Sequence, residues 1–206
     1  MATSKSDPIS LTGWQAAGAK ELRKIWEDLR TDSIEEGTER KFRGRNITPG
    51  EAGDVFERWV LEAFRLSGMT GHYAFPVSLR QSASTREQID GVILDGWQGF
   101  LVESKFWTKG VDFGPIALFH AHVETRPAGT MGLFFSAFGF TAPALEPAEL
   151  LRPFRVLLFD GDDLKWALTS GPFNGRMTEM IRRKWVLALK DGLPHRSVSD
   201  TIDLFN

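Results

Sequence analysis

Cysteine is absent from the 206 residues of the sequence. This absence excludes a disulfide framework, a thiolate metal site and a cysteine nucleophile, and it is typical of a reducing compartment such as the cytoplasm. The sequence also lacks an apolar run near the ~18 residues that a membrane-spanning helix needs, and its N-terminus shows no signal-peptide pattern. We therefore expect a soluble cytoplasmic protein that is not exported.

A strong net charge is missing as well, because the formal net charge at pH 7 is only −2. Affinity for nucleic acid would then depend on local basic patches. The serine-hydrolase elbow Gly-x-Ser-x-Gly and the glycine-rich nucleotide-binding motifs do not occur, which disfavours both kinds of chemistry. His120 and His122 are two residues apart on an expected helix and point to different sides, so a shared zinc site is not expected.

Hydrophobic residues make up 42% of the chain, with 7 Trp and 16 Phe, which is enough to build the core of one domain. Apolar spacing and end signals predict the order α-α-β-β-β-α-β-α-β-α, a mixed sheet with helices on its faces. The clearest helix start has Thr48 as N-cap, Pro49 at the first position and Glu51 completing a capping box. The expected helices are 12–30, 48–68, 113–125, 143–151 and 174–190, and the expected strands are 72–79, two hairpin strands between 88 and 105, 131–138 and 154–160, with a polar connector at 31–46.

The hairpin predicted between residues 88 and 105 carries the most informative charges. Two apolar runs flank a glycine-containing turn, as in a β-hairpin. With the turn centred at residues 96–97, Asp90 faces Glu103 on the opposing strand. Lys105 lies two residues beyond Glu103 and therefore on the same face of that strand. The hairpin thus brings two carboxylates and one ammonium group to one point.

The apolar surroundings of these charges suggest chemistry at this point. Near-continuous hydrophobic runs are typical of strands that are covered on both faces. Two acids held close together in such a setting repel each other unless a cation or a proton intervenes. Hard divalent ions such as Mg²⁺ prefer oxygen ligands. The pattern predicts a metal site with a catalytic lysine beside it; the alternative is that Lys105 neutralises one acid in a structural ion pair.

Four blocks of the sequence, taken in order, resemble the PD-(D/E)xK restriction-endonuclease-like nucleases, and in particular their Mrr-like branch. The resemblance implies an α/β fold with a mixed β-sheet core flanked by helices, preceded here by an N-terminal helical extension. It divides the chain into an N-terminal helix and basic connector at 1–46 and a nuclease domain at 47–206. The matching blocks are 53–57 with its Phe-Glu pair, 88–91 with Asp90, 102–105 with the Glu-x-Lys motif, and the later strands at 132–141 and 157–161.

This resemblance also implies roles for individual residues. Asp90 and Glu103 would coordinate Mg²⁺ or Mn²⁺ together with the main-chain carbonyl of Ser104. Glu57 would approach from the helix and help to hold the metal or its waters. Lys105 would either deprotonate the attacking water or stabilise charge on the transition state. An ammonium group with an ordinary pKa is a poor base, which favours the second role.

Other residues compete for some of these roles or extend the site. Glu51 and Glu62 lie on the same predicted helix as Glu57 and are rivals for its position. Trp107 shares a face with Glu103 and either stacks against a nucleotide or packs in the core. The basic segment 176–190 either contacts phosphates or forms a solvated surface.

The basic connector just before the second helix is the better candidate for contact with nucleic acid. It places Lys41, Arg43 and Arg45 within five residues and contains no acid between them.

We therefore predict a metal-dependent endonuclease that hydrolyses phosphodiester bonds of DNA, double-stranded, in defence by restriction or in DNA maintenance. One such site cuts one strand, so a homodimer is expected. Two alternatives stay open at this point. One is a non-catalytic nucleic-acid-binding or adaptor module of the same fold. The other is a nuclease subunit that acts only with a partner supplying target recognition.

Overall fold

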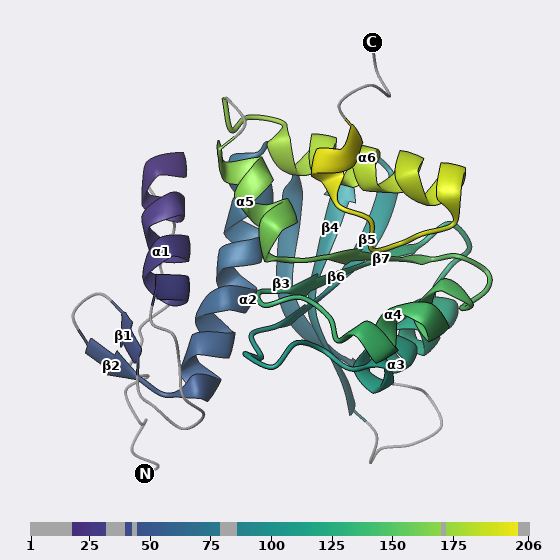
Figure 1. Cartoon of the computed structure of the whole chain (residues 1–206), viewed down its shortest axis with the longest axis horizontal. Coiled ribbons are helices and arrows are strands. Elements are labelled where there is room, and N and C mark those ends of the chain that lie inside the picture. The colour runs from purple at the N-terminus through teal and green to yellow at the C-terminus, as the bar shows by residue number, and fades with distance from the viewer. Residues whose placement is uncertain (1–17, 32–39, 43–44, 79–85, 170–171, 202–206) are drawn as a thin grey trace.

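The computed structural model describes residues 18–31, 40–42, 45–78, 86–169 and 172–201. A five-stranded mixed sheet lies between two groups of helices (Figure 1). The helices are α1 (Ala19–Thr31), α2 (Pro49–Leu66), α3 (Phe113–Glu124), α4 (Ala142–Glu149), α5 (Gly161–Thr169), α6 (Arg176–Asp191) and the short 3-10 helix η1 (Val198–Thr201). The strands are β1 (Arg40–Phe42), β2 (Arg45–Ile47), β3 (Thr70–Ser78), β4 (Arg86–Asp95), β5 (Gln98–Lys105), β6 (Met131–Ser136) and β7 (Val156–Phe159).

The strand order in the main sheet follows the chain, from β3 through β4, β5 and β6 to β7. The pairs β3–β4 and β4–β5 are antiparallel, whereas β5–β6 and β6–β7 are parallel. Parallel neighbours need a crossover connection, and α3 and α4 supply one each. The predicted mixed sheet with flanking helices is therefore confirmed, and β5 is the strand at which its direction of pairing changes.

Both faces of the sheet are covered, as the hydrophobic runs predict. Val102, Leu133 and Phe135 pack into one core with α1, α2, α5 and α6. Leu101 and Phe134, on the alternate positions of the same strands, pack into a second core with α3 and α4. The central strands thus have little contact with solvent along most of their length, which makes charged side chains on them conspicuous.

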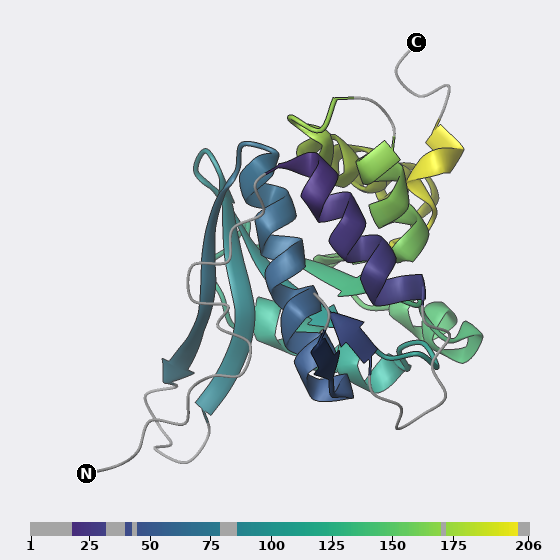
Figure 2. The ribbon, with the colours of Figure 1, turned by 90° about the vertical axis from the view of Figure 1, so that its left-hand side faces the viewer.

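Helix α1 packs against α2 through aromatic rings, and Figure 2 shows the two helices side by side. The Trp26 ring stacks on Trp59 at 5.0 Å between centroids and lies 6.0 Å from Phe56. The indole N–H of Trp59 donates a hydrogen bond of 2.8 Å to the carbonyl of Leu22. The described part of the N-terminal helix therefore belongs to the same core as the sheet.

The connector predicted at 31–46 is not wholly irregular, which corrects that expectation. Strands β1 and β2 form a short antiparallel pair in which Phe42 lies opposite Arg45. Phe42 and Ile47 are buried, with 4% and 1% of their surface exposed. These two apolar residues anchor the pair, whereas the surrounding charges suggested only a polar loop. Residues 12–17 of the first predicted helix lie outside the described residues.

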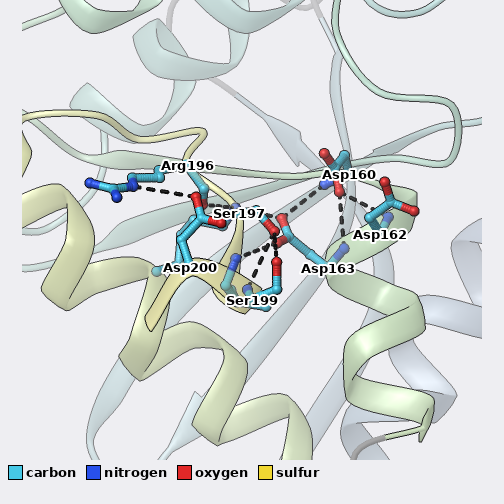
Figure 3. Close-up of polar contacts among 9 residues, drawn as sticks. Asp160, Asp162, Asp163, Arg196, Ser197, Ser199 and Asp200 are labelled. Atoms are coloured by element: carbon cyan, nitrogen blue, oxygen red, sulfur yellow. Dashed lines mark hydrogen bonds and ion pairs between the residues drawn. The ribbon is translucent and has the colours of Figure 1, made fainter. Parts of the chain in front are cut away.

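Helix α5 was not expected from the sequence, although its start carries a recognisable cap. The Asp160 carboxylate accepts hydrogen bonds from the backbone N–H groups of Asp162 and Asp163, at 2.9 and 3.0 Å. The Asp163 carboxylate accepts one in return from the N–H of Asp160, at 3.2 Å (Figure 3). This reciprocal arrangement is a capping box built from two aspartates, which satisfies backbone donors that a helix start leaves unpaired.

Asp163 also connects the C-terminal segment to α5. It forms an ion pair of 2.5 Å with Lys184 of α6, and both side chains are fully buried. Lys184 Nζ donates to the carbonyl of Arg196 at 2.7 Å, and the N–H of Val198 donates to Asp163 at 2.9 Å. Lys184 is therefore a structural residue. Segment 176–190 was predicted either to contact phosphates or to form a solvated surface, and the buried Lys184 does neither. None of the described helices is long and apolar enough to cross a membrane.

Candidate catalytic site

The β4–β5 hairpin has the predicted register. The ladder runs from the Asp95–Gln98 pair to the Gly91–Val102 pair. On its other side β5 pairs with β6 through Lys105. Beyond Val102, β5 is paired with β6 but no longer with β4. This C-terminal end of β5 carries the Glu-x-Lys motif.

Asp90 reaches across to β5 one residue beyond the last ladder pair. Its Oδ2 accepts a hydrogen bond of 2.8 Å from the backbone N–H of Ser104 and one of 3.1 Å from the Ser104 hydroxyl. Asp90 and Ser104 are both buried, at 9% and 8% exposure. Two donors on one oxygen fix the orientation of the carboxylate and leave Oδ1 available for another partner.

Glu103 and Lys105 lie two residues apart on β5, on the face predicted for both. They form an ion pair, which is the contact that the structural alternative expects. Burial, followed by the charge of Asp90, raises the pKa of Glu103 against the lowering effect of Lys105. Burial alone would lower the pKa of Lys105, but the charges of Glu103, Asp90 and Glu57 outweigh it and raise that pKa. The lysine is therefore an ammonium group across the neutral range, paired with one acid and close to two more.

Glu57 of α2 belongs to the same group of charges. Burial, then the charges of Asp90 and Asp54, raises the pKa of Glu57 to about 8; Glu103 adds to this rise and Arg58 opposes it. In the protein without a bound cation, this carboxyl group is therefore mostly protonated at neutral pH. The structure thus brings together Glu57, Asp90, Glu103 and Lys105 from one helix and two strands.

The two rivals of Glu57 on α2 have other roles. Glu51 completes the predicted capping box: its carboxylate accepts from the N–H of Thr48 at 2.7 Å, and the Thr48 hydroxyl accepts from the N–H of Glu51 at 3.2 Å. Glu62 is buried and forms an ion pair of 2.8 Å with Arg65. The charges of Asp90 and Glu103 on the hairpin act on Glu57.

Aromatic rings hold α2 against the end of β5. The ring of Phe106, next to Lys105 in the chain, lies 5.4 Å from Phe56, which precedes Glu57. The same Phe106 ring meets Phe138 edge-on at 5.2 Å. Contacts of this kind add to the burial of the rings and fix their mutual geometry. The position of Glu57 relative to Lys105 therefore depends on packing between neighbouring aromatic residues.

The donor set fits a hard divalent cation. Among the described residues, no group of three or more acidic or histidine side chains is already arranged around a metal position. Mg²⁺ does not require such a cage, because it commonly takes one or two protein carboxylates and completes its shell with water and phosphate oxygens. Asp90, Glu103 and the Ser104 carbonyl offer only oxygen donors. Burial first, and then the charge of Asp90, raises the pKa values of Glu103 and Glu57, and a bound cation would favour the charged forms of both groups.

Comparison with known protein families decides the classification. The family Mrr_cat, described as restriction endonuclease, matches residues 51–168, which is more than half of the chain. The chain belongs to this restriction endonuclease family. The matched region contains Glu57, Asp90, Glu103 and Lys105, and the predicted resemblance to the restriction-endonuclease-like nucleases is confirmed. No curated protein sequence matches the chain significantly.

Two solved structures are similar to this restriction endonuclease domain at low sequence identity. A protein of unknown function, AF1548, is 14% identical with a TM-score of 0.38, covering 67% of this chain and 77% of that one. The MspJI restriction endonuclease, solved in complex with a 27-mer oligonucleotide, is 18% identical with a TM-score of 0.35, covering 71% of this chain and 35% of that one. Likenesses this distant bear on neither substrate nor mechanism.

The residues predicted to contact nucleic acid are described only in part. Trp107 is 48% exposed, so the alternative of a buried core position is wrong. Lys41 lies in β1 and Arg45 begins β2, whereas Arg43 falls outside the described residues.

For Ser104 the sequence suggested only the main-chain carbonyl as a metal ligand. Its hydroxyl contact with Asp90 was missed, because a hydroxyl residue between Glu and Lys has no defined partner until the strands are paired.

Proposed function

We propose that this restriction endonuclease family member is a divalent-metal-dependent endonuclease that hydrolyses phosphodiester bonds of double-stranded DNA, in restriction or in DNA maintenance. The observation that carries the proposal is the convergence of Glu57, Asp90, Glu103 and Lys105 at the open end of the β4–β5 hairpin. Partly buried ionisable groups of this kind are costly, and their clustering in one place is typical of catalytic sites.

Asp90, Glu103 and the main-chain carbonyl of Ser104 would hold Mg²⁺ or Mn²⁺, with Glu57 contributing directly or through water. When bound, the ion supplies polarisation of the scissile phosphate and a water of lowered pKa. The Ser104 hydroxyl and N–H hold Asp90 Oδ2, so that Asp90 presents its other oxygen in a fixed direction. Such contacts orient a metal-binding carboxylate before the metal arrives.

Lys105 stabilises negative charge on the phosphate as the bond breaks. Its raised pKa keeps the side chain protonated at neutral pH, which argues against the alternative role as a base. A fixed ammonium group near the reacting phosphate lowers the barrier by electrostatic attraction to the charge that develops there. The ion pair with Glu103 positions this group in the absence of substrate.

DNA would approach the site along basic and aromatic residues outside the group of acids. Trp107, two residues after Lys105 and half-exposed, would contact a nucleotide or sugar. Lys41, Arg43 and Arg45 would neutralise backbone phosphates. Cutting both strands requires two copies of the site, so we infer a homodimer, either alone or with a partner subunit that supplies target recognition.

Cleavage of supercoiled and linear DNA by the purified chain tests the proposal. Wild-type protein with Mg²⁺ or Mn²⁺ is compared with Lys105→Ala, with an EDTA control and with Lys165→Ala, an exposed lysine of α5. We expect metal-dependent cutting that falls by about 10²–10³-fold in Lys105→Ala, as when one charge-stabilising group is removed, and that is unchanged in Lys165→Ala.

The outcomes separate the remaining alternatives. Absence of cutting with intact Mn²⁺ binding indicates a missing partner or activator. Absence of both cutting and Mn²⁺ binding refutes the nuclease proposal and leaves a nucleic-acid-binding or adaptor module. Equal loss in Lys105→Ala and Lys165→Ala would mean that the lysine effect reflects general charge and not chemistry.

A further inference from the structure

The turn of the β4–β5 hairpin presents a tryptophan to solvent. Trp97 is 92% exposed, the highest exposure among the large hydrophobic residues in the described part of the chain. Gly96 before it adopts φ of +60°, a left-handed conformation that suits glycine and closes the tight turn. Fully exposed tryptophans are uncommon on isolated proteins, and tryptophan is enriched among the residues that dominate binding at protein interfaces.

An apolar cavity lies next to this turn, between α6 and the sheet. Its volume is about 320 Å³, and Asp95 and Gln98, the residues on either side of the turn, form part of its rim. A cavity at the lower end of the ~300–1,000 Å³ range that holds small ligands has room for an indole ring. The apolar walls come from four elements of the fold: Phe100, Met131, Leu157, Ile181 and Trp185.

Two side chains of opposite charge belong to the lining of this cavity. Asp95 ends β4 and Arg182 lies on α6, and both line the cavity. Neither side chain has an ion-pair or hydrogen-bond partner among the residues that the structure describes. Leu189, seven residues after Arg182 on the same stripe of α6, is 68% exposed and extends the apolar surface. A projecting ring, a cavity and two complementary charges therefore occupy one patch.

We propose that this patch is the contact between two copies of the chain related by a two-fold axis. Trp97 of each copy enters the cavity of the other, and Asp95 of each copy pairs with Arg182 of the other. A two-fold contact requires a self-complementary surface, and this patch carries both halves of each interaction. The opposite charges of Asp95 and Arg182 within one patch favour a second copy as the occupant, whereas a small ligand would account for the cavity but not for the exposed ring beside it.

The proposed contact leaves both catalytic sites accessible. Gln98 and Lys105 are the two ends of β5, seven residues apart, which corresponds to roughly 23 Å along a strand. The contact lies at the Gln98 end and the catalytic residues lie at the Lys105 end. This inference deepens the homodimer of the proposed function, but its test does not depend on cleavage.

Sedimentation equilibrium of the full chain tests the contact. We expect a concentration-dependent dimer whose dissociation constant rises at least about 30-fold in Trp97→Ala, as for a dominant interface residue. Thr178→Trp, which places a large ring in the lining of the cavity, should weaken the dimer in the same way. Leu118→Ala, an exposed hydrophobic residue of α3 that does not line this cavity, should leave it unchanged.

Charge reversal gives a second, more specific readout. Asp95→Arg and Arg182→Asp should each weaken the dimer, and the double variant should restore it because both pairs are rebuilt with reversed sign. Each variant is first checked for an unchanged thermal unfolding temperature. The proposal is overturned by a wild-type protein that stays monomeric at its highest soluble concentration, or by a dimer that Trp97→Ala does not weaken. Metal-dependent cleavage by a monomer would overturn the contact and leave the nuclease proposal standing.

Discussion

Replacing Ser104 by alanine tests how the Asp90 carboxylate is held. The change removes the hydroxyl that donates to Asp90 Oδ2 at 3.1 Å, and it keeps the backbone N–H that donates at 2.8 Å. It also keeps the main-chain carbonyl that we assign as a metal ligand. Any effect on metal binding therefore reports the hydroxyl alone.

The expected size of the effect follows from these distances. Loss of a contact that orients a metal ligand costs about 10–100-fold in metal affinity or activity. The hydroxyl contact is the longer of the two and the N–H contact remains, so we expect the lower end, about tenfold or roughly 1.4 kcal/mol in Mn²⁺ affinity. The buried position adds a loss of about 1 kcal/mol in the free energy of unfolding of the metal-free protein.

The assay is Mn²⁺ titration by calorimetry on wild type, Ser104→Ala and Ser104→Thr, with the Mg²⁺ dependence of DNA cleavage measured in parallel. Ser104→Thr keeps a hydroxyl on a residue that suits a strand, and it should stay near wild-type affinity. A folded Ser104→Ala protein with unchanged Mn²⁺ affinity would refute the positioning role. Loss of affinity in both variants would show that the site responds to any change at Ser104.

Three further predictions concern stability. Lys184→Met should lower the free energy of unfolding by about 3–5 kcal/mol, because it leaves the buried Asp163 charge unpaired. Urea unfolding measures this loss of stability. A loss below about 1 kcal/mol would contradict the buried ion pair. Phe106→Ala should lower the free energy of unfolding by about 3–5 kcal/mol in the same assay. It should also reduce DNA cleavage, because the Phe106 ring positions α2. A variant with wild-type stability would argue against that role. Burial lowers the pKa of His195 against the opposing effect of Glu149. The stability that neutral His195 contributes is therefore present above its unfolded pKa of 6.5 and is lost as pH falls, so His195→Gln should lose less stability than wild type between about pH 7 and pH 5. Equal losses would refute this assignment.

Several features of the fold and site follow from local patterns alone. The register of the β4–β5 hairpin was predictable because a short turn fixes which residues face each other. The capping box at Thr48 and Glu51 was predictable because both partners lie within one helical turn. The Glu103–Lys105 contact was predictable because side chains two apart share a face of a strand.

Other features depend on contacts between distant parts of the chain. Lys184 appears in a basic segment, and only the packing of α6 against α5 shows that it is buried beside Asp163. Glu57 was separated from Glu51 and Glu62 only when α2 was placed against the hairpin. The same is true of the cavity beside Trp97, whose walls come from strands and a helix up to 85 residues apart.

The sequence by itself determined the family, the register of the hairpin and the identity of the acids on it, because these depend on neighbours along the chain. The tertiary structure decided which acid of α2 joins them, how Asp90 is oriented and which charges are buried. Burial and long-range electrostatics depend on which surfaces pack together, and residue spacing within one element does not contain that information.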